Sequence, residues 1–191
     1  MRGYFGIGVE SISKPMNLGN LMRSAHAFDA RFFFTVAAAF DAEQAAKADT
    51  SDSAAHLPLY TFDAVDDLLL PRHCKLVGVE FTDESEDLPQ LRHPPIAAYV
   101  LGREKGSLSP EMTARCDTLV KIPTKFCINV GVAGALVMYD RLISQGGFGR
   151  RPVSTNGRAE HLPKAERGAQ IVRGKSESSA ARKLDDPPAD R

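Results

Sequence analysis

The sequence predicts an α/β fold: a mainly parallel sheet with helices on both faces. Strand-like and helix-like segments alternate along the first 149 residues, and the strand segments, such as residues 4–9 and 75–81, are almost continuously apolar. Strands of a parallel sheet are buried on both faces, so they lack the polar alternation of a half-exposed sheet. The length of 191 residues and the 43% hydrophobic content suit one domain with a single core.

The first half of the chain supplies a strand, a helix and a second strand. Residues 4–9 (YFGIGV) are predicted to form a buried first strand. After Pro15, apolar side chains recur at helical spacing, and Asn20 is a candidate N-cap; the apolar positions are Leu21, Met22, Ala25 and Phe28. A second strand is expected at 31–36, a helix at 42–48 and a polar loop at 49–57.

The second half continues this alternation. We expect a short strand within 57–62, a short helix at 63–70 between Asp63 and Pro71, a strand at 75–81, a loop at 82–95 and a strand at 97–101. Ser109 is expected to cap a helix with Pro110 at its first position, where the missing N–H of proline costs nothing. The last strand is predicted at 118–122 and the last helix at 129–144.

The last helix combines a small-residue start with an apolar body. Asn129 opens it, and small residues follow at Gly131, Ala133, Gly134 and Ala135. Small side chains allow another backbone or a ligand to approach closely. Apolar residues then cover most sides of the helix, a pattern typical of a buried helix; they are Leu136, Val137, Met138, Leu142 and Ile143.

Charge divides the chain into a domain, residues 1–149, and a tail, residues 150–191. Ten of the 24 basic residues and six of the 24 acidic residues lie in the tail. The domain therefore keeps fourteen basic and eighteen acidic residues and is acidic, whereas the tail is basic. The tail has few apolar residues and is predicted to be flexible. The acidic domain lacks the strong basic charge of a general nucleic-acid binder.

The chain carries no apolar segment long enough to suggest a signal peptide or a membrane span, so we expect a cytoplasmic protein. Its three cysteines, Cys74, Cys116 and Cys127, are odd in number and lack C-x-x-C spacing. This pattern favours reduced thiols over a disulfide framework or a zinc ribbon. Neither a metal site nor membrane association is predicted.

Three polar clusters fall in or near loops that follow strands. The first contains Asn17, Gly19, Asn20 and Arg23, the second is LGREKGSLSPEM from Leu101, and the third is KIPTKFCINVGVAGALVMYDRL from Lys121. In parallel α/β folds, ligands bind outside the carboxyl ends of the strands, so we expect the three loops to converge. Each cluster alone is a weak signal, because Gly and Ser turns before helices are common.

Together, NLGNLMRSAHAF, LGREKGSLSPE and IPTKFCINVGVAGA closely resemble, in order and spacing, the three motifs of the SpoU (TrmH-like) RNA ribose 2′-O-methyltransferases. The resemblance spans residues 4 to about 145. It implies a SPOUT fold with a deep trefoil knot at its C-terminal side, a homodimer, and methyl transfer from S-adenosyl-L-methionine to tRNA or rRNA. The cofactor-binding residues it implies are Leu101, Gly102, Gly106, Ile122, Cys127, Ile128 and Val130.

The resemblance also implies catalytic roles. Arg23 matches the motif arginine; because a guanidinium stays protonated, we favour binding of the adjacent phosphate and stabilisation of the developing alkoxide over proton abstraction. Asn17 is expected to position Arg23 or the ribose. Glu104 is expected to hold loops or an arginine. Asn129 either caps the last helix or faces the substrate.

Cys127 departs from the family, which commonly has Ser at this place. A thiol is a weaker hydrogen-bond partner than a hydroxyl. Together with the acidic domain, this keeps open an alternative: an RNA-binding or ribosome-assembly factor that retains the fold with little catalysis. A Rossmann-type oxidoreductase is disfavoured, because no G-x-G-x-x-G follows the first strand.

Overall fold

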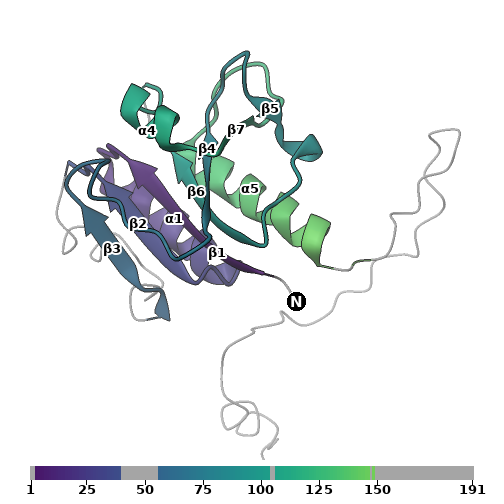
Figure 1. Ribbon diagram of the computed structural model, residues 1–191, viewed down its shortest axis with the longest axis horizontal. Helices are drawn as coiled ribbons and strands as arrows, with labels where there is room; N and C mark the ends of the chain where they lie inside the picture. Colours follow the sequence, from purple (N-terminus) through teal and green to yellow (C-terminus); the bar gives the residue numbers. More distant parts are fainter. Residues whose placement is uncertain (1–2, 40–55, 104–105, 147, 149–191) are drawn as a thin grey trace, which may run out of the picture. The chain divides into compact units, whose positions relative to one another are not determined.

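The computed structural model describes residues 3–39, 56–103, 106–146 and 148, and in this part of the chain seven strands form one sheet (Figure 1). All neighbouring strands pair in parallel, in the order β3-β2-β1-β6-β4-β7-β5. The strands are β1 (Tyr4–Glu10), β2 (Phe32–Val36), β3 (Leu59–Phe62), β4 (Lys75–Val79), β5 (Glu86–Asp87), β6 (Ile96–Leu101) and β7 (Thr118–Lys121). The predicted parallel sheet is confirmed.

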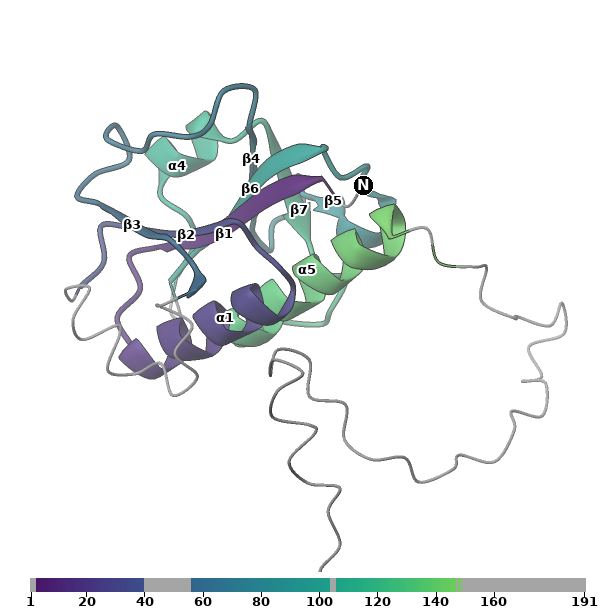
Figure 2. The same ribbon diagram turned by 90° about the horizontal axis from the view of Figure 1, so that it is seen from below.

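Helices lie on both faces of this sheet. Figure 2 shows α1 (Pro15–Ala27) and α5 (Val130–Gln145) side by side on one face and the short α4 (Pro110–Arg115) on the other. A Cβ at Gly134 would lie 2.2 Å from Leu21 Cδ1, so any side chain there would force Leu21 to move where α5 packs against α1. At Gly134, one of the small residues predicted at the start of α5, the missing side chain thus allows close packing of α5 against α1.

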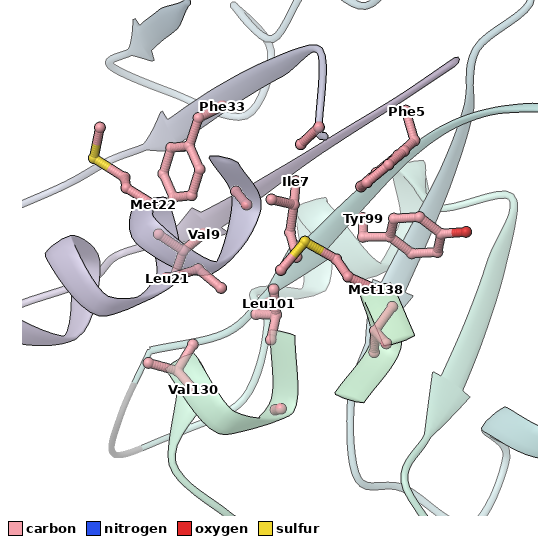
Figure 3. Packing of buried hydrophobic residues seen from close by; sticks show 14 of the residues in the cluster. Phe5, Ile7, Val9, Leu21, Met22, Phe33, Tyr99, Leu101, Val130 and Met138 are labelled. Atoms are coloured by element: carbon pink, nitrogen blue, oxygen red, sulfur yellow. The ribbon is translucent and has the colours of Figure 1, made fainter. Parts of the chain in front are cut away.

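The core has one apolar layer on each face of the sheet. Between the sheet and the helices α1 and α5, Met22 and Met138 pack with Ile7, Phe33 and Leu101 (Figure 3). On the opposite face, Phe34, Leu76, Val100 and Met112 form a second cluster. Because side chains on both faces are buried, the central strands need apolar residues at nearly every position.

α1 begins earlier than predicted. Its first residue is Pro15 and its N-cap position is Lys14, so the prediction that Asn20 caps this helix was wrong. Proline is favourable at the first helical position, where its N–H is not needed. Asn17 therefore lies inside the first turn of α1 rather than in a loop before a helix.

The helix predicted at 63–70 is a set of turns. Its backbone bonds, Asp67 N to Ala64 O and Leu68 N to Val65 O, span three residues only. The segment thus forms turns in place of the continuous i→i−4 bonds of an α-helix. The loop predicted at 82–95 in turn contains β5 and the 3-10 turn η1 (Leu88–Gln90), which the polar sequence there did not predict.

α5 is buried on one face only, contrary to the expectation of a helix buried on most sides. Val132, Leu136 and Tyr139 follow each other at helical spacing and are 52%, 40% and 45% exposed. They form an apolar stripe that faces away from the sheet. Other predicted features are confirmed: Ser109 Oγ caps α4 by accepting from Met112 N at 3.0 Å, and Asn129 is the N-cap of α5.

Three predictions fall outside the described residues: the helix at 42–48, the role of Glu104, and the flexible tail at 150–191. Within the described ranges, no helix has the length and apolar content needed to cross a membrane. None of the three cysteines forms a disulfide in the structure.

Candidate cofactor site

A cavity of about 360 Å³ opens at the carboxyl ends of β4, β6 and β7, next to the first turns of α1 and α5. All seven residues predicted to bind the cofactor line it: Leu101, Gly102, Gly106, Ile122, Cys127, Ile128 and Val130. Asn17 and Asn129 line it as well. The structure thus brings the three sequence clusters to one place, as the rule for parallel sheets predicts.

Two asparagines from distant motifs close one side of the cavity. Asn129 Nδ2 donates to Asn17 Oδ1 at 3.1 Å, which links the start of α5 to the first turn of α1. Asn129 Oδ1 simultaneously accepts from Gly131 N at 2.9 Å and from Val132 N at 3.4 Å. Asn129 is therefore a helix cap and a cavity residue at once, and the two roles proposed for it do not compete.

The loop between β6 and α4 forms a second wall. Gly106 has a φ of +142°, and a Cβ there would lie 2.4 Å from Arg103 Nε. This conformation is costly for any residue with a side chain. The side chain of Arg103 thus packs over Gly106 beside the cavity.

The loop between β7 and α5 forms the third wall. Thr124 stiffens it, since its backbone N donates to Ile122 O at 2.7 Å and its Oγ1 donates to Phe126 O at 2.9 Å. Phe126 and Cys127 are both exposed, and of the two only Cys127 lines the cavity. By contrast, burial raises the pKa of Cys74 to about 11 and that of Cys116 to about 12, which keeps both as thiols.

Sequence reasoning missed other lining residues: Lys14, Val79, Glu80, Phe81, Arg103, Lys121, Thr124 and Ala133. A signal for Glu80 was present, because it comes directly after the buried strand β4 and must therefore lie at the carboxyl edge of the sheet. Glu80 is the one carboxylate among the described lining residues, beside three cationic side chains.

Arg23 does not line the cavity. It lies on the exposed surface of α1, and its guanidinium forms no ion pair with any described residue. Its position suits contact with a ligand outside the cavity better than contact with a group bound deep inside.

The lining chemistry suits a nucleoside-like group. The lining combines apolar side chains with polar and charged ones; the apolar ones include Val79, Leu101, Ile122, Ile128 and Val130. The volume falls within the range of small-molecule sites, roughly 300–1,000 Å³. Among the described residues no three His, Cys, Asp or Glu side chains are grouped as metal ligands would be.

Residues 5–139 match the SpoU rRNA Methylase family, and the chain belongs to that family. A relative is tRNA (guanosine(18)-2'-O)-methyltransferase TARBP1 of Mus musculus, 28% identical over 137 residues. That alignment covers 68% of this chain and 9% of the mouse protein, so the chain spans a small part of this relative.

Solved structures share the fold. The SpoU methyltransferase AviRb of Streptomyces viridochromogenes in complex with AdoMet has a TM-score of 0.67 at 20% identity, over 76% of this chain and 62% of that one. A structure described as giving insights into the 2-OH methylation of C/U34 on tRNA has a TM-score of 0.66 at 22% identity, over 78% of this chain and 100% of that one. The A. aeolicus TrmH/SpoU tRNA modifying enzyme has a TM-score of 0.65 at 18% identity, over 80% of this chain and 82% of that one.

Proposed function

We propose that this protein transfers a methyl group from S-adenosyl-L-methionine to a ribose 2′-hydroxyl of tRNA or rRNA. The observation that carries the proposal is the cavity where all three family motifs meet, lined by every residue that the motifs assign to the cofactor. Family membership supports the reaction class. So do the AdoMet complex of AviRb and the tRNA 2'-O-methyltransferase name of the mouse relative.

S-adenosyl-L-methionine, when bound, supplies an electrophilic methyl group on a sulfonium. The apolar walls at Leu101, Ile122 and Ile128 would hold its adenine ring, and Glu80 would accept hydrogen bonds from its polar groups. Gly102 and Gly106 add no side chain of their own to the loop wall. These residues bind and orient the cofactor and keep water from the reacting face.

Arg23 would act on the RNA rather than on the cofactor. An exposed guanidinium that forms no ion pair with a described residue is available for a bidentate bond to a phosphate. Such a bond would fix the ribose next to that phosphate and stabilise negative charge as its hydroxyl attacks. Asn17 and Asn129, joined at the cavity edge, would orient the same ribose.

The apolar stripe Val132, Leu136 and Tyr139 supports the predicted homodimer, because a second copy of the chain would bury it. Light scattering tests this: we expect the wild type to be a dimer and Leu136→Glu to be a monomer. A monomeric wild type would contradict the homodimer.

The trefoil knot stays a prediction of the family resemblance. A cytoplasmic location is likewise proposed from the sequence alone.

Two measurements test the function. Calorimetry with S-adenosyl-L-methionine should give a one-to-one complex, and cofactor labelled on its methyl group should transfer the label to RNA from cells that lack the gene. Absence of cofactor binding would contradict the proposal. Binding without transfer to any RNA would favour the alternative of an RNA-binding factor, for which Cys127 in the cavity is the motivating observation.

A further inference from the structure

Two carboxylates hold the base of the loop that walls the cavity. Glu80 Oε2 accepts from the backbone N of Leu108 at 2.6 Å, and Glu10 Oε2 accepts from the backbone N of Ser109 at 2.8 Å. Both are short hydrogen bonds to a charged acceptor, the stronger class of such bonds. Consecutive N–H groups of one loop are thus held by side chains that lie 70 positions apart in sequence.

The sheet explains how these two side chains reach one loop. β6 lies between β1 and β4, and Leu101 pairs with Val9 on one side and with Val79 on the other. Glu10 and Glu80 are the next residues of the flanking strands, so they stand on either side of Gly102, where the chain leaves the sheet.

Gly102 shows how tight this base is. A Cβ at Gly102 would lie 3.1 Å from Leu108 N and 3.5 Å from Glu80 Oε2. The chain thus leaves the sheet at Gly102 and returns at Leu108 in close contact, and Arg103 and Gly106, which line the cavity, lie on the loop in between.

Glu10 is only 4% exposed and does not line the cavity. Burial of a carboxylate is costly unless it is hydrogen-bonded. A purely apolar residue would serve the core better at this position, whereas the carboxylate supplies the acceptor that fixes Ser109.

From these contacts we propose that Glu10 and Glu80 are positioning residues that clamp residues 106–109 against Gly102, in the arrangement that binds the cofactor. The proposal deepens, and rests on, the proposed use of the cavity for S-adenosyl-L-methionine. Glu80 also faces the cavity, so Glu10, which acts only through the loop, is the diagnostic member of the pair.

Calorimetry of the full chain with S-adenosyl-L-methionine tests the clamp. Glu10→Ala is expected to raise the Kd at least about tenfold, because Ser109 N loses a charged acceptor. Glu10→Gln keeps an acceptor oxygen and should stay within about threefold of wild type. The control Glu84→Ala removes an equally charged but exposed side chain nearby and should change nothing.

The double variant Glu10→Ala with Glu80→Ala sharpens the test. Both residues hold one loop, so the combined loss of affinity should be smaller than the product of the single losses. If Glu10→Ala binds the cofactor as wild type does, even with a lower melting temperature, the carboxylate serves stability alone and the clamp is refuted.

Amide hydrogen exchange separates failure of the clamp from failure of the proposed function. Without any cofactor, the N–H groups of Leu108 and Ser109 should be protected in the wild type and should exchange at least about tenfold faster in Glu80→Ala and Glu10→Ala respectively. Unprotected amides in the wild type would overturn the clamp, whatever the protein binds. A wild type that protects these amides yet binds no cofactor would refute the proposed function while upholding the clamp.

Discussion

The two ends of helix α5 carry polar clusters of opposite character. At its start, Asn129 is exposed and borders an open cavity. Near its end, Arg141 is 2% exposed and belongs to a closed network with His93, Tyr99 and Asp140. One helix thus serves a binding site with its first turn and the stability of the domain with its last turns.

The buried network has a single consistent direction of hydrogen bonding. Arg141 Nη1 donates to Tyr99 Oη at 3.0 Å, so the Tyr99 hydroxyl donates to His93 Nδ1 at 2.6 Å. His93 Nε2 then donates to Asp140 Oδ2 at 2.9 Å. Burial raises the pKa of Tyr99 to about 12, which keeps the hydroxyl protonated as this direction requires.

The comparison separates polar groups that serve stability from those left for a ligand. In the buried network the guanidinium of Arg141 also donates to the carbonyls of Pro94 and Pro95, at 2.7 and 3.1 Å, and lies over the ring of Phe5. At the other end of α5, Cys127 and Arg103 line the open cavity. Buried polar groups must be paired within the protein, whereas a binding site keeps its hydrogen-bonding capacity open.

The largest expected effect on stability comes from Arg141→Ala. It leaves Tyr99 Oη and Pro94 O without the Arg141 donor, whereas Pro95 O still accepts from Tyr4 N, and we expect the free energy of unfolding to fall by about 3 kcal/mol or more. Urea unfolding measures this. The control Arg31→Ala, which breaks an exposed ion pair with Asp29, should change the same quantity by less than about 1 kcal/mol. A small effect for Arg141 would contradict its role in the network.

On the exposed surface of α1, Arg23→Ala should reduce methyl transfer about 100-fold or more while leaving the cofactor Kd nearly unchanged. The reason is that Arg23 lies outside the cavity and would contact only RNA. Single-turnover transfer and calorimetry on the same preparation measure the two quantities. An equal loss of both would contradict the assigned role.

Two variants of Asn129 separate its cap from its site role. Asn129→Ala removes the acceptor for Gly131 N and should cost about 1 kcal/mol of stability together with activity. Asn129→Asp keeps that acceptor but cannot donate to Asn17, so it should retain stability and lose methyl transfer. Full activity in Asn129→Asp would show that the link to Asn17 is not needed.

The closed end should also make stability depend on pH. Burial lowers the pKa of His93 below its ordinary value of 6.5, and the bond to Asp140 opposes this only in part. Neutral His93 therefore contributes stability that is fully present above about pH 6.5 and is lost as the pH falls towards the folded pKa. Thermal unfolding between about pH 8 and pH 5 should show this loss, and His93→Gln should reduce it. An unchanged slope in the variant would contradict the assignment.

The smallest effect is expected for Cys127→Ser, which we expect to be tolerated or to improve transfer. A hydroxyl is the usual family residue and a better hydrogen-bond partner than a thiol. Thiol labelling of the wild type tests whether Cys127 is accessible. Cys127 is exposed and should react first, because Cys74 and Cys116 are partly buried and their pKa values are raised. Complete inactivation by Cys127→Ser would require thiol chemistry in the mechanism.

The sequence predicted the parallel sheet and the meeting of the three motifs, because apolar strands and loops at their carboxyl ends leave clear local patterns. It could not predict β5, whose Glu86 and Asp87 have low strand propensity and pair only because β7 lies beside them. The start of α1 at Pro15 could have been read from the sequence, since proline favours the first helical position.

Long-range polar contacts were the hardest to predict. Nothing in the local sequence indicates that Glu10 reaches Ser109 or that His93 joins Tyr99 to Asp140. Glu10 did carry a hint, because it is a charged residue at the end of a buried strand, but its partner depends on the strand order. Such partners become visible only when the sheet is assembled.

The most direct test of the central claim is amide hydrogen exchange of the full chain with and without S-adenosyl-L-methionine. We expect the cofactor to slow exchange at Gly102, Gly106 and residues 128–130, with little change at His93 and Arg141, whose amides lie at the closed end. Protection confined to the closed end, or no protection at the cavity, would contradict the account.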